Sequence, residues 1–227
     1  QPPQKSHRGQ KINKSPIQGI SETLNIDYRT PKTLKDNHEE YEFLKELNAD
    51  LAIVCAYGQI IPENFLNLTK KGFVNIHASI LPSWRGAAPI QRSIMNLDPE
   101  TGISIMKIKK ELDSGPVSNI YKIKIDQNQN AQEISEKLSA LAAEKILDNV
   151  DDILEDKAKF IDQDHSKATY AKKIDKEESR IDWDEDASKI IGKINGLFPS
   201  PGASFSFNGE RYKILKAEIG NGIGQVG

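Results

Sequence analysis

The sequence predicts an α/β fold in which a mostly parallel sheet is followed by a second, β-rich unit. Three observations support this prediction. Residues 51–77 read as strand, helix and strand, which is the unit that builds parallel sheets. A long amphipathic helix is expected after Asn130. Near the C-terminal end, the pair Asn208-Gly209 lies between two alternating runs and predicts an antiparallel hairpin.

The composition is that of an ordinary globular protein. Its 227 residues are 37% hydrophobic and 28% charged, with a formal net charge of −2, so any nucleic-acid contact must be local. Cys55 is the only cysteine, which excludes an internal disulfide framework, and we expect it to be a small buried hydrophobe. No apolar run approaches the ~20 residues that cross a bilayer. We therefore predict a cytoplasmic protein without membrane contact.

Both ends of the sequence read as cuts through a longer chain. The first residues are Gln1-Pro2-Pro3, and the last eight, 220–227, form a glycine-rich run. Residues 1–18 predict a basic, irregular loop, because four cations and no acid lie among prolines: Lys5, Arg8, Lys11 and Lys14. Such a loop could meet a phosphate backbone. On composition alone, a solvated loop or an effect of truncation explains it equally well.

The next elements form the strand–helix–strand unit. Residues 36–47 predict an amphipathic helix with Tyr41, Leu44 and Leu47 on one face. The continuous apolar run 51–56 is typical of a strand covered on both faces. A helix is expected to begin at Pro62, and the second strand starts at Phe73.

The stretch 73–91 carries the most chemistry in the sequence. Asn75 and His77 are two residues apart on a strand, so their side chains share a face. An amide dipole beside a titratable imidazole suits a carbonyl that becomes an oxyanion while an amine loses a proton. A polar loop after such a strand is where open α/β sheets bind ligands. Taken alone, however, most pairs of this kind are strand-end residues satisfied by loop backbone.

The remaining elements follow in order. We expect a helix over 89–96, strands over 102–108 and 117–125, and Asp113 in the tight turn between those strands. Ordinary Asp-Ser-Gly turn chemistry would by itself explain Asp113. Asn130 and Glu133 form a capping box ahead of the long helix. A short helix over 187–197 and strands over 204–207 and 211–217 complete the second unit. His165 is expected at the surface without a role.

Several strings then carry a resemblance to a known family. The string N-I-H-A-S-I-L-P-S-W-R-G-A-A-P-I-Q, with L-D-S-G some thirty residues later, resembles the formyltetrahydrofolate-dependent formyltransferases. The match extends to R-G-Q-K-I-N-K-S-P-I at 8–17, A-Y-G-Q-I-I-P at 56–62, T-Y-A-K-K-I at 169–174 and E-E-S-R-I-D-W at 177–183. The resemblance thus covers nearly the whole chain, and W-R-G-A-A-P-I-Q is its most specific part.

The resemblance implies a domain organisation. Residues 1–160 would form the catalytic domain, a Rossmann-like, mostly parallel sheet with helices on both faces, lacking the family's first strands and Gly-Thr-Pro loop. Residues 161–173 would be a linker. Residues 174–227 would begin a small OB-like β-barrel. No metal-ligand cluster occurs in the sequence, and the family's chemistry requires none.

The resemblance also assigns site residues. Asn75, His77 and Asp113 match the family's catalytic positions. The loop that contacts folate is matched by Ser79, Ile80, Leu81 and Pro82. The loop that approaches the acceptor end of a tRNA is matched by Arg8, Lys11 and Lys14.

The implied reaction transfers the formyl group of 10-formyltetrahydrofolate to the α-amine of methionine on initiator tRNA, for initiation of translation. Asn75 would stabilise the tetrahedral oxyanion, an interaction typically worth about 3–4 kcal/mol of barrier. His77 would either hydrogen-bond that oxygen or relay the amine proton, and Asp113 would orient its ring. Folate and initiator tRNA are the partners implied, and we expect a monomer.

Two alternatives stay open at this point. Sister enzymes share the three polar residues but formylate a glycinamide ribonucleotide or an amino-sugar nucleotide, or deliver the group to water. The basic loop and the second domain favour a large polyanionic acceptor over these. A folate- or tRNA-binding module without catalysis is the alternative from another class, and the presence of all three polar residues argues against it.

Overall fold

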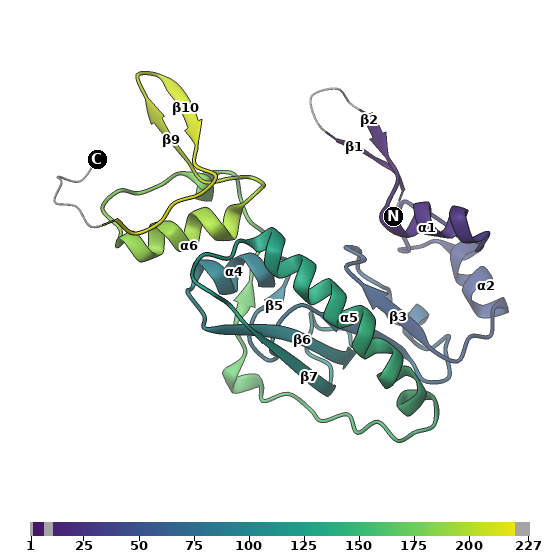
Figure 1. Ribbon diagram of the computed structural model, residues 1–227. Helices are drawn as coiled ribbons and strands as arrows, with labels where there is room; N and C mark the ends of the chain where they lie inside the picture. The colour runs from purple at the N-terminus through teal and green to yellow at the C-terminus, as the bar shows by residue number, and fades with distance from the viewer. Residues whose placement is uncertain (1, 7–10, 221–227) are drawn as a thin grey trace.

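A four-stranded sheet forms the centre of the computed structural model, which describes residues 2–6 and 11–220 (Figure 1). Its strands lie in the order β3-β4-β6-β7. Their bounds are β3 Ala52–Cys55, β4 Phe73–His77, β6 Glu100–Lys107 and β7 Val117–Lys124. Helices lie against this sheet, so the α/β fold class is confirmed.

The sheet is mixed. β3 and β4 are parallel and are joined through the short helix α3 (Glu63–Leu66), which confirms the predicted strand–helix–strand unit. β6 pairs antiparallel with β4, and β7 pairs antiparallel with β6. The helix α4 (Pro89–Met95) between β4 and β6 has seven residues, or about 10 Å of length. The chain turns back after α4, so β6 runs antiparallel to its neighbour β4.

Two helices cover one face of the sheet. α5 (Ala131–Leu154) presents Ile134 and Leu138 to Ile103 of β6, together with Ile94 of α4. The predicted capping box is present: Asn130 Oδ1 accepts from the Glu133 amide at 3.0 Å, and Glu133 Oε2 accepts from the Asn130 amide at 2.9 Å. The sheet face opposite α5 carries Asn75 and His77, because side chains alternate along β4.

The N-terminal region differs from its prediction. β1 (Gln4–Ser6) and β2 (Lys11–Asn13) pair as an antiparallel hairpin, and α1 (Pro16–Leu24) follows. The expectation of an irregular loop is therefore wrong for these residues. The start of α1 has a signal in the sequence, because Ser15 Oγ accepts from the Gln18 amide at 3.1 Å and Pro16 occupies the first turn.

The strand β3 also corrects an expectation. It lies at the edge of the described sheet, where Cys55 is exposed and Ile53 is 48% exposed. The apolar run predicted a strand buried on both faces, but a short run does not specify what covers it. The preceding helix α2 (His38–Glu46) is capped by Asn37, and Leu47 lies beyond its last residue and is exposed.

The second unit contains a helix and a hairpin. α6 is Ala187–Leu197, and β9 (Ser204–Phe207) pairs antiparallel with β10 (Glu210–Lys213). Asn208 and Gly209 both have positive φ, 49° and 81°, as the tight turns between such strands require. The helix and the hairpin are thus confirmed. The described residues of this unit contribute one hairpin, so the β-barrel stays a prediction.

Helix α6 packs closely on α4. A Cβ at Gly196 would lie 2.6 Å from Met95 Cγ, and a Cβ at Gly192 would lie 2.8 Å from Leu97 Cδ2. Arg92 of α4 also forms a two-pronged ion pair with Glu178, at 2.5 and 2.9 Å. Glu178 belongs to the short helix η2 (Glu177–Ser179). The two units are therefore held together by close packing of α6 on α4 and by the Arg92–Glu178 ion pair.

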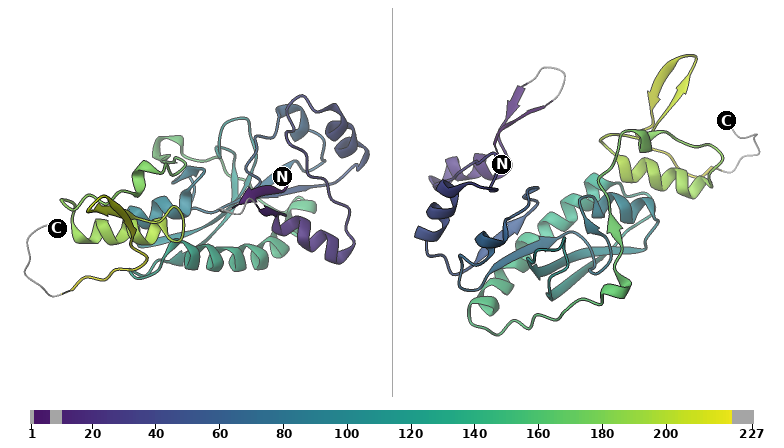
Figure 2. Two further views of the ribbon diagram at one scale, coloured as in Figure 1. Left: turned by 90° about the horizontal axis from the view of Figure 1, so that it is seen from above. Right: turned by 180° about the vertical axis from the view of Figure 1, so that it is seen from behind.

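The segment predicted as a linker is packed against the first unit. β8 (Tyr170–Ala171) pairs parallel with β5 (Arg85–Gly86), and the helix η1 (His165–Lys167) precedes it. The two hairpins, β1–β2 and β9–β10, project from the same side of the molecule (Figure 1 and Figure 2). Among the described helices, α5 included, none combines the length and the apolar character that a membrane span needs.

Truncating the core should destabilise the protein strongly. Ile134→Ala removes a fully buried side chain between α5 and the sheet. We expect the free energy of unfolding to fall by about 2–5 kcal/mol, because the lost contacts leave a cavity. Leu147→Ala on the same helix is the control, since Leu147 is 71% exposed. Chemical denaturation of both variants measures the difference, and equal losses would contradict the assigned core.

The Arg92–Glu178 pair should make stability depend on pH. Hydrogen bonds from Arg92 lower the pKa of Glu178 from its ordinary 4.5. The stabilisation is therefore fully present above pH 4.5 and is lost as the pH falls through the lower folded-state pKa. Glu178→Gln should reduce the acid-dependent loss of Tm, by the equivalent of about 1 kcal/mol. Glu177→Gln, at an exposed neighbour, should leave the curve unchanged. If Glu178→Gln shows the same dependence of Tm on pH as the wild type, the Arg92–Glu178 pair does not contribute the predicted stability.

Candidate active site

His77 ends β4 with both ring nitrogens facing acceptors of the protein. Its Nε2 lies 2.9 Å from the carbonyl oxygen of Trp84, and its Nδ1 lies 3.6 Å from Asp113 Oδ2. Because a carbonyl oxygen only accepts, Nε2 must carry its proton and donate it to Trp84. The ring is 6% exposed, so it is held in a largely dry site. Nδ1 is thus the ring atom of His77 that faces Asp113.

Asp113 reaches this site from a tight turn. Its backbone is left-handed, with φ 46°, and its Oδ2 accepts a hydrogen bond from the Gly86 amide at 2.8 Å. Gly86 itself has φ 121°, and a Cβ there would lie 2.7 Å from the Ala171 carbonyl oxygen. The carboxylate is therefore placed by two backbone turns that are distant in sequence. The structure brings Asp113 and His77 together, as the sequence predicts.

Asn75 lies on the same sheet face as His77. In the antiparallel register, Asn75 is opposite Met106 and His77 is opposite Ser104. The side chain is half-buried, and no residue in the described part of the chain hydrogen-bonds its amide. A polar group that is oriented by a strand but unpaired is available to a ligand. Asn75 can therefore offer an N–H donor toward the space beside the His77–Asp113 pair.

The loop that follows His77 is fixed mainly by Ser104 of β6. The Ser104 hydroxyl donates to the Ser79 carbonyl at 2.7 Å and accepts from the Leu81 amide at 3.1 Å. Ser79 Oγ donates to the Ser83 carbonyl at 2.6 Å. Ser79 and Leu81 are buried, so Ile80 and Pro82 supply the side-chain surface of the predicted folate loop.

A buried Arg85–Gln163 pair connects the Trp84 loop to the Asp113 turn. Arg85 is 3% exposed, and its Nε and Nη2 donate to Gln163 Oε1 at 3.1 and 2.8 Å. Gln163 Nε2 in turn donates to the carbonyls of Asp113 and Gly115, at 2.9 and 2.7 Å. Arg85 Nη2 also lies 3.1 Å from His165 Nδ1. One amide side chain thus ties together the two loops that bear on His77.

These connecting residues have little signal in the sequence. Arg85 lies within the string W-R-G-A-A-P-I-Q, where its position suggests a role but not a partner. Gln163 lies in an acid-rich segment that reads as a solvated connection. His165 is exposed, as expected, but its contact with Arg85 is not evident from sequence. Pairings between residues some eighty positions apart follow from the tertiary fold alone.

The predicted tRNA-contacting residues lie apart from this site. Arg8 lies outside the described residues, and Lys11 belongs to β2. Lys14 forms an exposed ion pair with Glu22 at 2.7 Å. Hydrogen bonds lower the pKa of Glu22 to about 2, and the bond from Lys14 has the largest effect. The basic segment is thus part of the β1–β2 hairpin and its exit.

A hollow of about 750 Å³ opens beside the Asp113 turn. Its lining includes Phe73, on the Asn75 face of β4, and Ser114, the neighbour of Asp113. Five lysines also line it: Lys70, Lys71, Lys107, Lys109 and Lys110. Two glutamates, Glu63 and Glu111, line it as well, so its lining has an excess of three positive charges. Its size is that of a typical small-molecule site, and this excess suits a ligand with carboxylates.

Comparisons with known proteins identify the family of the chain. A family model described as "Formyl transferase" matches residues 1–150, and one described as "Formyl transferase, C-terminal domain" matches residues 173–227. A methionyl-tRNA formyltransferase of Pelagibacter ubique (strain HTCC1062) is 67% identical over 227 residues, which are 100% of this chain and 73% of that protein. One from Dictyoglomus turgidum is 44% identical over 219 residues, covering 96% of this chain and 70% of that protein.

Solved structures share the fold at lower identity. A 4-N formyltransferase from Francisella tularensis superposes with a TM-score of 0.73 at 22% identity, covering 89% of this chain and 84% of that one. HypX from Aquifex aeolicus, solved in complex with tetrahydrofolic acid, gives 0.67 at 20% identity, covering 79% of this chain and 31% of that one. The chain therefore belongs to the formyl transferase family, and the curated relatives that it matches along its length are methionyl-tRNA formyltransferases.

Proposed function

We propose that this protein transfers the formyl group of 10-formyltetrahydrofolate to the α-amine of methionyl initiator tRNA, for initiation of translation. The observation that carries the proposal is the 67% identity over the whole chain to a methionyl-tRNA formyltransferase. Asn75, His77 and Asp113 supply the chemistry. The amine nitrogen forms a bond to the formyl carbon, the bond from that carbon to N10 breaks, and a proton passes from the amine to N10.

In this reaction Asn75 is the oxyanion donor. Attack of the amine turns the formyl oxygen into an alkoxide, and the unpaired Asn75 amide lies on the face where a substrate can meet it. A donor held in place before the reaction stabilises the developing charge without reorganisation.

The His77–Asp113 pair handles the proton. Because Nε2 donates to Trp84, Nδ1 of the neutral ring is an acceptor, and it can take a hydrogen bond from Asp113 once that carboxyl holds the proton. Asp113 Oδ2 is engaged by the Gly86 amide, so Oδ1 is proposed as the oxygen that takes up the proton. We assign Asp113 as the group that receives the amine proton, and His77 as its electrostatic partner.

The formyl donor is proposed to lie in the hollow beside the Asp113 turn. Folate carries glutamate carboxylates, and the lysines that line the hollow complement them. Ile80 and Pro82 would contact the folate through side chains, whereas Ser79 and Leu81 would do so through their backbone.

The acceptor tRNA is proposed to approach the side from which both hairpins project (Figure 1). Lys11 and Lys14 belong to β2 and its exit, whereas Arg8 lies outside the described residues. The β9–β10 hairpin adds exposed Arg211 and Lys213. Two basic projections on one side suit a long polyanion better than a nucleotide-sized acceptor.

Three further assignments accompany this function. We propose a catalytic domain over 1–160, a connecting segment over 161–173 and a β-barrel domain from 174 onward. A translation enzyme of this kind would act in the cytoplasm, and a monomer suffices because all proposed catalytic residues come from one chain.

The deciding experiment compares acceptors. Formyl transfer from 10-formyltetrahydrofolate is measured with methionyl initiator tRNA, free methionine and an amino-sugar nucleotide. We expect transfer to the charged tRNA alone. Transfer to the amino-sugar nucleotide would keep the chemistry and exclude the proposed acceptor. Folate binding without transfer to any acceptor would identify a binding module.

Asn75→Asp should slow the chemical step severely. The substitution keeps the size of the side chain but removes its N–H donor, so single-turnover transfer should fall by about 10²–10³-fold. Asn119→Asp, an identical change at an exposed position of β7, is the control. Equal rates for wild type and Asn75→Asp would exclude an oxyanion role.

Gln163→Glu should lower kcat by about tenfold to a hundredfold, because Asp113 is displaced. The carboxylate still accepts from Arg85 but cannot donate to the carbonyls of Asp113 and Gly115. The KM for each substrate should change little. Gln129→Glu is the control, since its oxygen accepts a backbone N–H that a carboxylate also accepts. A fall in stability with unchanged kcat would leave Gln163 a purely structural residue.

A further inference from the structure

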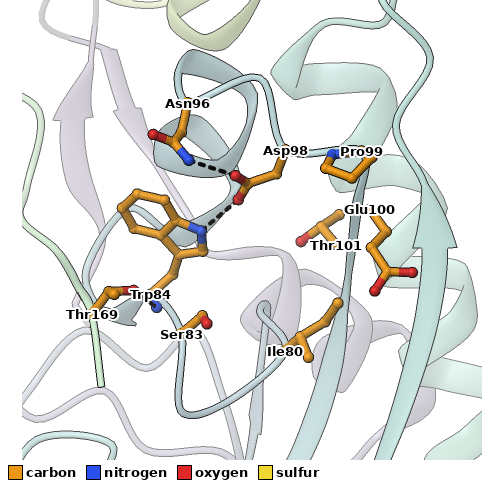
Figure 3. Close-up of a pocket in the computed structure, with 9 residues that line it drawn as sticks. All are labelled: Ile80, Ser83, Trp84, Asn96, Asp98, Pro99, Glu100, Thr101 and Thr169. Atoms are coloured by element: carbon orange, nitrogen blue, oxygen red, sulfur yellow. Dashed lines mark hydrogen bonds between the residues drawn. The ribbon is translucent and has the colours of Figure 1, made fainter. Parts of the chain in front are cut away.

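A second hollow, of about 380 Å³, lies between the Trp84 loop and the junction of α4 with β6 (Figure 3). None of the proposed catalytic residues lines it, but Ile80 of the predicted folate loop does. The indole of Trp84 forms one wall, and Ile80 and Pro99 add apolar surface. The carbonyl of the same Trp84 accepts the hydrogen bond of His77. A molecule against this indole would therefore lie close to the reaction centre.

The hollow contains a buried polar group without a protein partner. Thr101 is 2% exposed, and no residue in the described part of the chain hydrogen-bonds its hydroxyl. Figure 3 shows the Thr101 oxygen on the side that faces Trp84. A buried hydroxyl without a partner is unfavourable in the free protein. A ligand with a hydrogen-bond acceptor at this point would relieve that cost.

The charge of the hollow restricts the ligand. Its lining includes two carboxylates and no lysine or arginine. Asp98 accepts from Trp84 Nε1 at 2.7 Å and from Asn96 Nδ2 at 2.6 Å, which leaves lone pairs free on both oxygens. Glu100 is neutralised by Lys122 at 2.6 Å. Phosphates and carboxylates are disfavoured here, and a neutral group that donates N–H is favoured.

We propose that this hollow binds an unpaired adenine or cytosine of the acceptor strand. The base stacks on Trp84, its exocyclic amino group donates to Asp98, and the Thr101 hydroxyl donates to a ring nitrogen. Adenine and cytosine both place an amino donor beside a ring-nitrogen acceptor. Single-stranded ends are read by such stacking and edge contacts. The proposal rests on the proposed function, because every tRNA ends in unpaired C-C-A.

Tryptophan fluorescence tests the hollow without the reaction. The chain has two tryptophans, so Trp183→Phe leaves only the emission of Trp84. Titration with the trinucleotide C-C-A should quench this emission saturably. The trinucleotide U-U-U, which has the same charge and no amino groups, should quench it much more weakly. Equal responses to both, or no response, would overturn the proposal.

Thr101→Val supplies the second test, because it removes the hydroxyl while keeping the shape. We expect weaker C-C-A binding and a higher KM for methionyl-tRNA, each by about threefold to tenfold. The KM for the formyl donor and the Tm should not fall. Thr23→Val is the control: it is the same change at an exposed position of α1, and Thr23 lines neither hollow. An unchanged acceptor KM, or an equal increase with Thr23→Val, would overturn the assignment.

The two proposals fail in different ways. If wild-type protein does not formylate methionyl-tRNA, the proposed function fails. If it does, but the trinucleotide and Thr101→Val show no effect, only the base-binding hollow fails.

Discussion

The site depends on one amide side chain that holds two loops together. Gln163 accepts from the buried Arg85 and donates to the carbonyls of Asp113 and Gly115. Without Gln163, the buried guanidinium of Arg85 would keep only His165 as a side-chain partner among the described residues, and a buried charge with so few partners is costly. The segment between the two units thus helps to hold the candidate active site in place. Through β8 it pairs with Arg85 and Gly86 of β5, and the Thr169 hydroxyl accepts from the Trp84 amide.

Residues with local signals could be predicted from the sequence. Asn130 and Glu133 gave the start of α5 because a capping box is a four-residue pattern, and Asn208-Gly209 gave the hairpin because few residues accept positive φ. The convergence of His77 and Asp113 was expected from the family resemblance. The partners of Arg85 were not, because a side chain some eighty residues away leaves no periodic trace.

The errors have equally local causes. The sequence predicts a loop over 1–18 because the two strands found there have three residues each, too few for alternation to show. Cys55 was expected inside because apolar residues usually are, but burial depends on what lies against a strand. The antiparallel direction of β6 has no signal in the sequence, because the connection from β4 is long enough for the chain to return in either direction.

The close contact of α6 with α4 limits how far the second unit can move relative to the first. Two glycines of α6 approach α4 so closely that a methyl group at either would collide with Met95 or Leu97. Interlocked surfaces of this kind resist sliding, because any shift must first separate the helices. The position of α6 relative to α4 is therefore set when the chain folds. For the proposed reaction, an acceptor that contacts both units would have to match a separation that already exists in the free protein.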